Sequence, residues 1–380
     1  MAMPRQPRPS SKNSDRAVPV DLSEDFGVIC GFLAKLPIVR KVSPDGERDI
    51  HIYVDDDRDL YLELILDRVG VRAWIGSVDQ ELSLSGTFPR DDRGLIKFLA
   101  GCDHLEIRGQ RLRFFAAGRS SQIAMSRAAH HQWVSVGVCP SPVPYPDEVS
   151  SRIALALEDS SDSQMYLDFS NLSAYFRSVN HFYLTLPAQF TWKTRAVDLD
   201  FLRLVDLLPA GDRVIGLCDD GRCFAASGSI EIVCPCVDRE VPDIAGQMKH
   251  FPVPDTAVPF GVIWQINGQM PNGRSVLGVS ASERFAVCDP DMPGMYCVSL
   301  PDAVSISENF AVQRKYLTMA HRIFGPDAEL FISSRFACLQ DDGGRLFFAA
   351  CSYQHNFGSF GGGNVGRQRP GTGRGRGSTR

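Results

Sequence analysis

Four cysteines lie within nineteen residues of the 380-residue chain, a density at which a zinc site has to be considered. They are Cys218, Cys223, Cys234 and Cys236. Zinc ribbons use paired C-x2-C spacings, whereas these cysteines are spaced C-x4-C and C-x-C. Cys223 and Cys234 also sit in the runs CFAAS and EIVCPCV, which are typical of buried strands. We interpret the four as small core residues, with zinc as the alternative, and expect neither a metal nor another cofactor.

Other polar groups also have simple interpretations. His130-His131 could be a ligand pair or a base, but no Cys or acid lies near them in sequence, which favours a loop or strand end. The run DDDRD at 55–59 could hold Mg²⁺ but is more often a solvated turn. Residues 219–220 and 341–342 are Asp pairs before glycines in two similar segments, which is turn chemistry. No phosphate loop, nucleophile elbow or metalloprotease motif is present, so we expect no catalysis.

The C-terminal segment 358–380 is rich in Gly and Arg and has too few apolar groups to offset the entropy of ordering it. Residues 355–380 carry five arginines and no acid. We expect a disordered tail that contacts nucleic acid as a flexible polycation; the alternative is a tail that only adds solubility. Its candidate contacts are Arg367, Arg369, Arg374 and Arg376.

Charge is divided unevenly along the chain. The formal net charge is −5, while residues 1–17 carry +3 and residues 355–380 carry +5, which leaves the middle near −13. An acidic body with basic ends meets a polyanion only through local patches or tails. We expect residues 1–20 to be a disordered basic arm. The arm has no apolar core of a secretory signal, and eleven cysteines fit reduced thiols, so we expect a cytoplasmic protein without a membrane segment.

Three segments that would position such patches resemble one another: 93–118, 194–228 and 310–351. Each begins with a Leu-rich helical pattern, passes a Gly turn and ends in a strand with Phe-Ala. The phenylalanines are Phe115, Phe224 and Phe348, at separations of 109 (115 to 224) and 124 (224 to 348). A weak repeat of this length predicts an architecture of similar domains.

Proline-rich connectors at 139–148 and 238–260 separate the similar segments. Many short alternating runs surround each segment, among them RIALALE at 152–158, and we expect them to be strands. A helix is expected near Ser23. The sequence therefore predicts an α+β protein of three similar antiparallel-sheet domains with a few short helices. The predicted bounds are 21–138, 147–240 and 256–355.

The third helical pattern has one basic face. Spacings of three, four and eight residues place the polar side chains together and the apolar ones opposite. The polar face has Arg314, Lys315, Thr318 and Arg322; the apolar face has Phe310, Leu317, Ala320 and Phe324. Such a face suits contact with phosphates without reading of bases, and the alternative is a solvated amphipathic helix.

The other two helical patterns support nucleic-acid contact less well. The first offers Arg93 and Lys97 at i and i+4. The second has Asp198, Asp200 and Asp206, which would repel phosphates, and its nearby cations are Lys193 and Arg195 just before it. We include all four cations among the expected DNA contacts.

The segment 310–333, FAVQRKYLTMAHRIFGPDAELFIS, resembles the part of the last domain of the bacterial three-domain DNA sliding clamp in which a Tyr-Leu on a helix is followed by a strand. The length and the acidic body are similar to those of the clamp as well. The resemblance implies a ring of six similar subdomains, with sheets outside and helices lining a hole for duplex DNA. A divergent clamp encoded by a phage or plasmid fits this pattern.

The resemblance also implies a partner set. A clamp is a non-catalytic processivity factor that tethers a DNA polymerase or other replication protein to duplex DNA, is placed by a clamp loader and works here as a homodimer. In bacterial clamps the C-terminal residues help wall the cleft for partner peptides, whereas here a Gly/Arg tail follows Cys351, so no cleft residues are assigned. The alternative function is a β-rich viral or plasmid interaction protein whose tail binds nucleic acid.

Overall fold

The computed structural model describes most of the chain between residues 16 and 351. The described ranges are 16–36, 49–66, 69–82, 84–89, 99–127, 139–157, 164–254, 257–273, 275–281, 284–288, 297–302, 304–306, 308–333 and 335–351. The chain divides into two compact units. The first comprises Met1–Pro252 with Asp342–Arg345, and the second comprises Val253–Asp341 with Leu346–Arg380.

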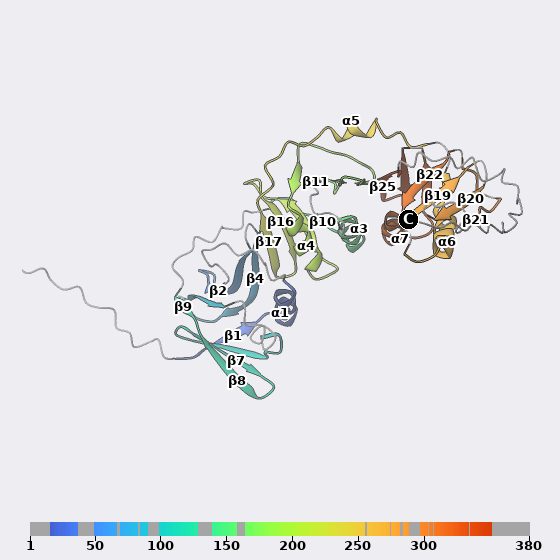
Figure 1. The fold of residues 1–380 in the computed structure, drawn as a ribbon. Coiled ribbons are helices and arrows are strands. Elements are labelled where there is room, and N and C mark those ends of the chain that lie inside the picture. The colour runs from blue at the N-terminus through green and yellow to red at the C-terminus, as the bar shows by residue number, and fades with distance from the viewer. Residues whose placement is uncertain are drawn as a thin grey trace, which may run out of the picture. The chain divides into compact units, whose positions relative to one another are not determined.

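One motif, a strand, a helix and three further strands, accounts for nearly all the elements (Figure 1). The first copy consists of β1 (Val18–Leu22), α1 (Phe26–Lys35), β2 (Asp49–Val54), β3 (Asp59–Leu66) and β4 (Val69–Val78). The second has β5 (Ser85–Pro89), a helix described only at Leu99 and Ala100, β6 (His104–Arg108), β7 (Arg111–Ala116) and β8 (Arg119–Ala124). The short β9 (Ser126–Arg127) follows.

The next two copies complete the first compact unit. One comprises β10 (Val143–Pro144), α3 (Asp147–Leu157), β11 (Gln164–Asp168), β12 (Ala174–Arg177) and β13 (His181–Thr185). The other comprises β14 (Thr194–Val197), α4 (Leu199–Leu207), β15 (Val214–Leu217), β16 (Cys223–Ser227) and β17 (Ile230–Cys234). The short helix α5 (Ile244–Met248) follows them.

The last two copies lie at the C-terminal end of the described chain. One has β18 (Ala257–Pro259), α6 (Phe260–Gln269), β19 (Val276–Ser280), β20 (Phe285–Cys288) and β21 (Cys297–Ser299). The other has β22 (Phe310–Gln313), α7 (Arg314–Phe324), β23 (Glu329–Ile332), β24 (Phe336–Gln340) and β25 (Gly344–Ala349). The described part of the chain therefore repeats one βαβββ motif six times.

The six motifs are joined in three pairs by an exchange of strands. In each pair, the first strand of one motif forms antiparallel hydrogen bonds with the strand that follows the helix of the other motif. The exchanged pairings are β1–β6 and β5–β2, then β10–β15 and β14–β11, then β18–β23 and β22–β19. Each motif therefore completes the sheet of its partner.

The first and second pairs share a continuous sheet. Strand β17 pairs antiparallel with β4, in register from Ile230↔Ala73 to Val233↔Gly70, and the two strands lie side by side in Figure 1. At the junction, Arg72 and Glu231 are directly opposite and form an ion pair of 2.7 Å. Backbone hydrogen bonds and a matched charge pair thus join the two pairs within the first compact unit.

The core follows the strand and helix periods. In β4 the burial alternates over most of its length, with Val71, Ala73 and Ile75 buried. Helix α1 buries one face, with Phe26, Ile29, Cys30, Phe32 and Leu33. The α+β, mainly antiparallel class predicted from the sequence is confirmed, as is a helix close to Ser23. No helix in the described ranges is long and apolar enough to cross a bilayer.

Two sequence expectations are wrong in detail. The basic arm was expected to extend to residue 20, but β1 begins at Val18, because Val18 and Val20 are buried where β1 pairs with β6 and β4. RIALALE was expected to be a strand, yet its residues 152–157 belong to α3. Pro146 precedes that helix, Asp147 and Glu148 occupy its first turn, and such residues favour a helix start.

Several expectations fall outside the described residues. These are His130-His131, Arg93, Lys97, and the arginines of the 358–380 tail together with residues 1–15 of the arm. The run at 55–59 is a turn, in which the Asp55 carboxylate accepts the backbone N–H groups of Asp57 and Asp59.

Candidate nucleic-acid interface

Helix α7 presents the basic face expected from the sequence. Lys315, Thr318 and Arg322 lie on it at least partly exposed, whereas Tyr316, Leu317, Met319, Ala320 and Ile323 are buried. The Lys315 ammonium lies 4.9 Å from the centroid of the Tyr316 ring, so its stem covers apolar surface while its charge stays in water. Arg322 lies in the last turn, where a cation favours the helix.

Arg314 has a structural role that the sequence pattern does not reveal. Its guanidinium donates hydrogen bonds to Asn267 Oδ1 at 2.6 Å, to the Asn267 carbonyl at 2.8 Å and to the Pro271 carbonyl at 2.7 Å. These acceptors lie in the last turn of α6 and just after it, and the Asn267 carbonyl also accepts the backbone N–H of Met270. Arg314 thus ties the start of α7 to the end of α6, and its contact with DNA stays a prediction.

The packing of α6 beside α7 fixes the orientation of this face. The Trp264 and His321 rings stack with centroids 4.1 Å apart and an interplanar angle of 11°. The exposed positions of α6 include Gln265 and Gln269, and α6 contains no charged residue. The surface formed by α6 and α7 is therefore cationic through α7 alone, with no acid in either helix.

Helices α3 and α4 carry the opposite charge pattern. Asp198 caps α4 by accepting the backbone N–H of Asp200, and Arg203 pairs with Asp200 at 2.9 Å. In α3, Arg152 pairs with Glu148 at 3.0 Å. The cations of these helices are thus neutralised locally, which makes the pair a poor surface for phosphate.

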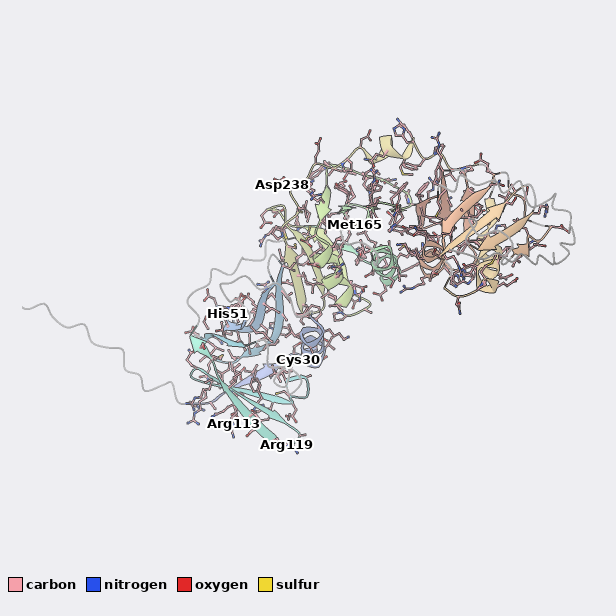
Figure 2. All side chains as sticks on the ribbon, in the orientation of Figure 1. Cys30, His51, Arg113, Arg119, Met165 and Asp238 are labelled. Atoms are coloured by element: carbon pink, nitrogen blue, oxygen red, sulfur yellow. The ribbon has the colours of Figure 1, made fainter. Side chains whose placement is uncertain are left out.

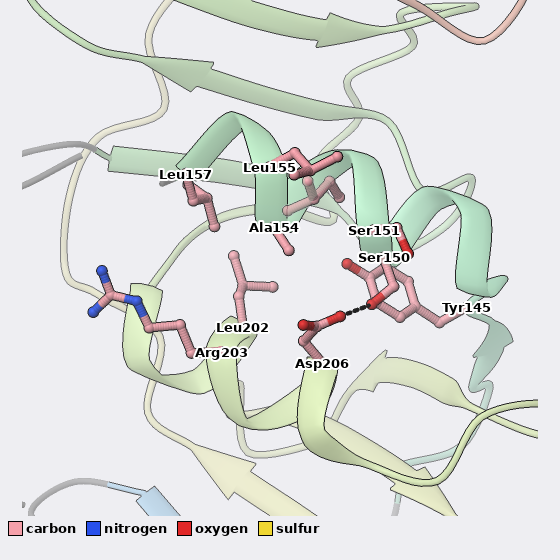
Figure 3. A pocket seen from close by; sticks show the side chains of 10 residues that line it. Tyr145, Ser150, Ser151, Ala154, Leu155, Leu157, Leu202, Arg203 and Asp206 are labelled. Atoms are coloured by element: carbon pink, nitrogen blue, oxygen red, sulfur yellow. Dashed lines mark hydrogen bonds between the residues drawn. The ribbon is translucent and has the colours of Figure 1, made fainter. Parts of the chain in front are cut away.

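A cleft of ≈ 530 Å³ lies between α3 and α4 (Figure 3). Its walls are mainly apolar, and Ser150 donates a hydrogen bond of 3.0 Å to the Asp206 carboxylate at one side. The buried Arg213 donates to the Ser150 hydroxyl, and also to the Leu208 carbonyl at 2.6 Å and the Asp206 carbonyl at 3.0 Å, which satisfies the end of α4. Arg213 thus serves α4 as Arg314 serves α6.

Lys193 and Arg195 lie before α4, on a turn and on β14. Arg195 donates to the carbonyls of Trp192 and Thr194 at 2.7 and 2.8 Å. The Lys193 ammonium lies 5.5 Å from the centroid of the Trp192 ring, and Trp192 is 77% exposed. The turn therefore displays an exposed aromatic ring beside the Lys193 ammonium, and Arg195 is bonded to its backbone.

A buried carboxylate holds this turn. Asp168 accepts hydrogen bonds from the backbone N–H of Thr191 at 2.6 Å and from the hydroxyls of Thr191 and Thr194 at 2.6 and 2.8 Å, and also from Ser170. Burial alone would raise the pKa of Asp168, but the hydrogen bonds from Ser170 and Thr191 outweigh it and lower the pKa to about 2. The carboxylate is therefore ionised at neutral pH.

A second group of arginines was missed in the sequence, one of which, Arg113, pairs with Glu106 at 3.8 Å. Arg111 and Arg113 alternate along β7 with the buried Leu112 and Phe114, and Arg108 lies directly opposite Arg111 on β6. Figure 2 shows Arg113 and Arg119 on the hairpin of β7 and β8. The signal was present as the period-two pattern RLRFF, which places both arginines on the solvent side of a strand.

The four clustered cysteines lie at one end of the β15–β17 meander. Cys218, Cys223 and Cys234 are buried and Cys236 is half-buried, with the Cys223 and Cys236 sulfurs 3.2 Å apart. Among the described residues, no three His, Cys, Asp or Glu side chains are grouped so that they could hold a metal.

No protein-family model matches the sequence, and no curated protein matches it. Several solved structures do match the fold of this chain. The β clamp of Helicobacter pylori superposes with a TM-score of 0.69 at 13% identity, over 89% of this chain and 100% of that chain. The chain has the fold of bacterial β sliding clamps. The Pseudomonas aeruginosa DNA polymerase III subunit β gives a TM-score of 0.66 at 12% identity, over 88% of this chain and 100% of that one.

One of the clamp structures contains a partner peptide. The Helicobacter pylori β clamp bound to a DNA ligase peptide gives a TM-score of 0.65 at 14% identity, over 88% of this chain and 99% of that one. At these identities the likeness concerns the fold. It confirms the clamp-like architecture, and the sites on it follow from the residues of this chain.

Proposed function

We propose that this protein is a non-catalytic sliding clamp that encircles duplex DNA and tethers a replication protein to it. The observation that carries the proposal is the sixfold βαβββ repeat in three strand-exchanged pairs, over a length matched by whole clamp chains. On this proposal the three pairs are three domains. The bounds expected from the sequence, 21–138, 147–240 and 256–355, begin too late for the first two domains, which start with β1 at Val18 and β10 at Val143. A DNA polymerase, a clamp loader and a cytoplasmic location belong to the same proposal.

The surface expected to meet DNA is the basic face of α7, with Arg93 and Lys97 of the segment before β6 as further contacts. A helix that carries cations and no acid of its own attracts phosphates without reading sequence, as sliding requires. The acidic α3 and α4 contribute little. A ring therefore has few phosphate contacts, and its retention on DNA depends on closure more than on affinity.

Two sheet edges offer a way to close a ring from two copies. Strand β8 is the last strand of its sheet, and Arg119, Ser120, Ser121 and Gln122 on it are exposed; β21 is the last strand of the sheet β21-β20-β19-β22. An unpaired strand edge is a template for another strand. We propose that β8 of one copy pairs with β21 of the other, twice, in a head-to-tail homodimer.

The test compares retention on nicked circular and linearised DNA at about 0.2 M salt, where simple phosphate contacts weaken steeply. The full chain and a chain ending at Phe357 are loaded on the circle with a matching loader, and bound protein is measured after gel filtration. The clamp proposal predicts that both proteins stay on the circle and leave after linearisation.

The alternative function, an interaction protein that holds nucleic acid only by its tail, predicts a different pattern. In that case the full chain binds circular and linear DNA equally, and the chain ending at Phe357 binds neither. That result would contradict the clamp proposal.

A further inference from the structure

Two thiols outside the proposed DNA surface are close enough to react with each other. The sulfurs of Cys223 and Cys236 lie 3.2 Å apart, near van der Waals contact. Cys223 begins β16 and is fully buried, whereas Cys236 is half-buried two residues after the end of β17. One thiol is therefore accessible to a small reagent, and the second lies directly behind it.

The surroundings of Cys236 favour its thiolate. The hydrogen bond between the Cys223 and Cys236 sulfurs lowers the pKa of Cys236, burial opposes this effect, and the positive charge of Arg195 lowers the pKa further. Arg195 is held in place by its hydrogen bonds to the Trp192 and Thr194 carbonyls. In contrast, burial raises the pKa of Cys102 and of Cys351, which are also half-buried.

We propose that Cys236 and Cys223 form an oxidation site, in which a hydroperoxide converts the pair to a disulfide. The Cys236 thiolate attacks a peroxide oxygen, so that an S–O bond forms and the O–O bond breaks. This step gives a sulfenic acid, and the leaving oxygen takes a proton and departs as water or an alcohol.

The second step uses the buried thiol. The Cys223 sulfur attacks the Cys236 sulfur, an S–S bond forms and the S–O bond breaks, and the hydroxyl leaves with the Cys223 proton as water. Overall, two thiols lose two electrons and two protons, and one peroxide is reduced. The hydrogen bond to the Cys236 thiolate, which is the main cause of the raised pKa of Cys223, is absent once Cys236 is a neutral sulfenic acid.

The disulfide would join parts of two sheets. Cys223 belongs to the sheet that contains β15, β16 and β17, while the residue after Cys236, Val237, is bridged to Ala196 on β14 of the sheet with β11. A covalent link there fixes the connection between the two sheets of the second pair. We expect the oxidised protein to unfold at a higher temperature than the reduced protein.

Cys234 is a second possible disulfide partner of Cys223, so the test must distinguish a 223–234 bond from a 223–236 bond. It lies opposite Cys223 in the register of β16 and β17, but its thiol donates to the Pro235 carbonyl at 3.3 Å. The proposed pairing with Cys236 therefore predicts that Cys234→Ala keeps the disulfide, whereas Cys236→Ala abolishes it.

The experiment treats the reduced full chain with hydrogen peroxide, alkylates the remaining thiols and maps peptides by mass spectrometry. We expect a reducible 223–236 cross-link, loss of two hydrogens in mass, and modification of Cys236 at least about tenfold faster than Cys102. Cys223→Ala is expected to leave Cys236 as a sulfenic acid that dimedone labels.

Three results would each overturn the proposal: a Cys223–Cys234 cross-link, a disulfide that survives Cys236→Ala, or equal reaction of Cys236 and Cys102. Circular dichroism of each variant shows whether it is folded. If Cys223→Ala fails to fold, the comparison of Cys236→Ala with Cys234→Ala still decides, since Cys236 is only half-buried.

Discussion

Two arginines, Arg314 and Arg213, have the same structural role at the C-terminal ends of two helices. Arg314 was expected to contact DNA because it lies on the basic face of α7, yet its guanidinium is engaged with the end of α6. Arg213, buried at 9% exposure, does the same for α4. Sequence patterns reveal the charge of an arginine but not the carbonyl groups that a fold brings to it, so these roles could not be predicted.

The lowered pKa of Asp168 predicts that the free energy of unfolding falls in acid. Its folded pKa of about 2 lies below the unfolded value of about 3.9, so its contribution is present above pH 4 and is lost as the pH falls toward 2. Asp168→Asn should lower the free energy of unfolding at pH 7 by about 2 kcal/mol and flatten its decline below pH 4. Urea unfolding from pH 7 to pH 2 measures both effects.

The control for this prediction is Asp56→Asn, at an exposed position in the turn at 55–59. It should leave the free energy of unfolding within about 0.5 kcal/mol of the parent protein. If Asp168→Asn were as stable as the parent at pH 7, the hydrogen bonds of the turn would not require the ionised carboxylate.

At the scale of elements, the exposed cations of α7 are expected to affect DNA binding without affecting the stability of the fold. The double variant Lys315→Ala, Arg322→Ala should reduce the slope of log K for DNA against log salt by about 2 for each α7 in contact, because each lost phosphate contact removes about 0.9. Neither side chain belongs to the buried face of the helix, so the unfolding midpoint should hardly change. Fluorescence anisotropy with duplex DNA measures the slope.

Arg314→Ala is the contrasting variant. It leaves the Pro271 carbonyl and the side-chain oxygen of Asn267 without the donor that Arg314 supplies, which should cost about 1–3 kcal/mol of stability. An unchanged salt slope in the double variant would remove α7 from the DNA surface, whatever happens to Arg314→Ala.

The sequence predicted that the chain contains a repeat, but it aligned the third copy with the wrong strand. In the structure, Phe115 and Phe224 lie on the middle strands β7 and β16 of their meanders, but Phe348 lies on the last strand, β25. The strand that corresponds to β7 and β16 is β24, and its Phe-Ala pair is Phe336-Ala337, at a separation of 112 (224 to 336). The shift arose because DDGR at 219–222 and DDGGR at 341–345 have similar sequences but close different hairpins, β15–β16 in one motif and β24–β25 in the other.

The two motifs within each pair were harder to recognise in the sequence. Three motifs were recognised because a helix with a clear apolar face precedes a short hairpin; the other three were obscured by weak helices. In α3, RIALALE alternates like a strand, while the signals for a helix, Pro146 and the acids after it, lie outside that run. The strand exchange within pairs could not be predicted, because it depends on pairing far apart in sequence.

For the whole molecule, the two free edges predict a dimer. Light scattering after gel filtration should give about twice the chain mass of 41.9 kDa. The backbone N–H groups of neighbouring residues on a strand point to opposite sides of it. Proline has no N–H group, so one of the two variants Ser121→Pro and Gln122→Pro removes a hydrogen-bond donor from the free side of β8. That variant should be a folded monomer.

The other proline variant removes a donor that faces β7 and serves as the control for damage to the hairpin. Circular dichroism identifies which of the two remains folded. A folded protein that stays dimeric with proline at either position would exclude β8 from the interface.

The exchange of strands has a consequence for synthesis on the ribosome. Val143 of β10 pairs with Ile215 of β15, and Val258 of β18 pairs with Leu330 of β23, each 72 positions later. Until the later strand has left the exit tunnel, the earlier one is an unpaired edge next to a helix that lacks its sheet. Pairings this distant slow folding. The nascent chain therefore exposes apolar surface in three successive intervals, each ended by the arrival of a single strand, and these are the stages at which it most needs a chaperone.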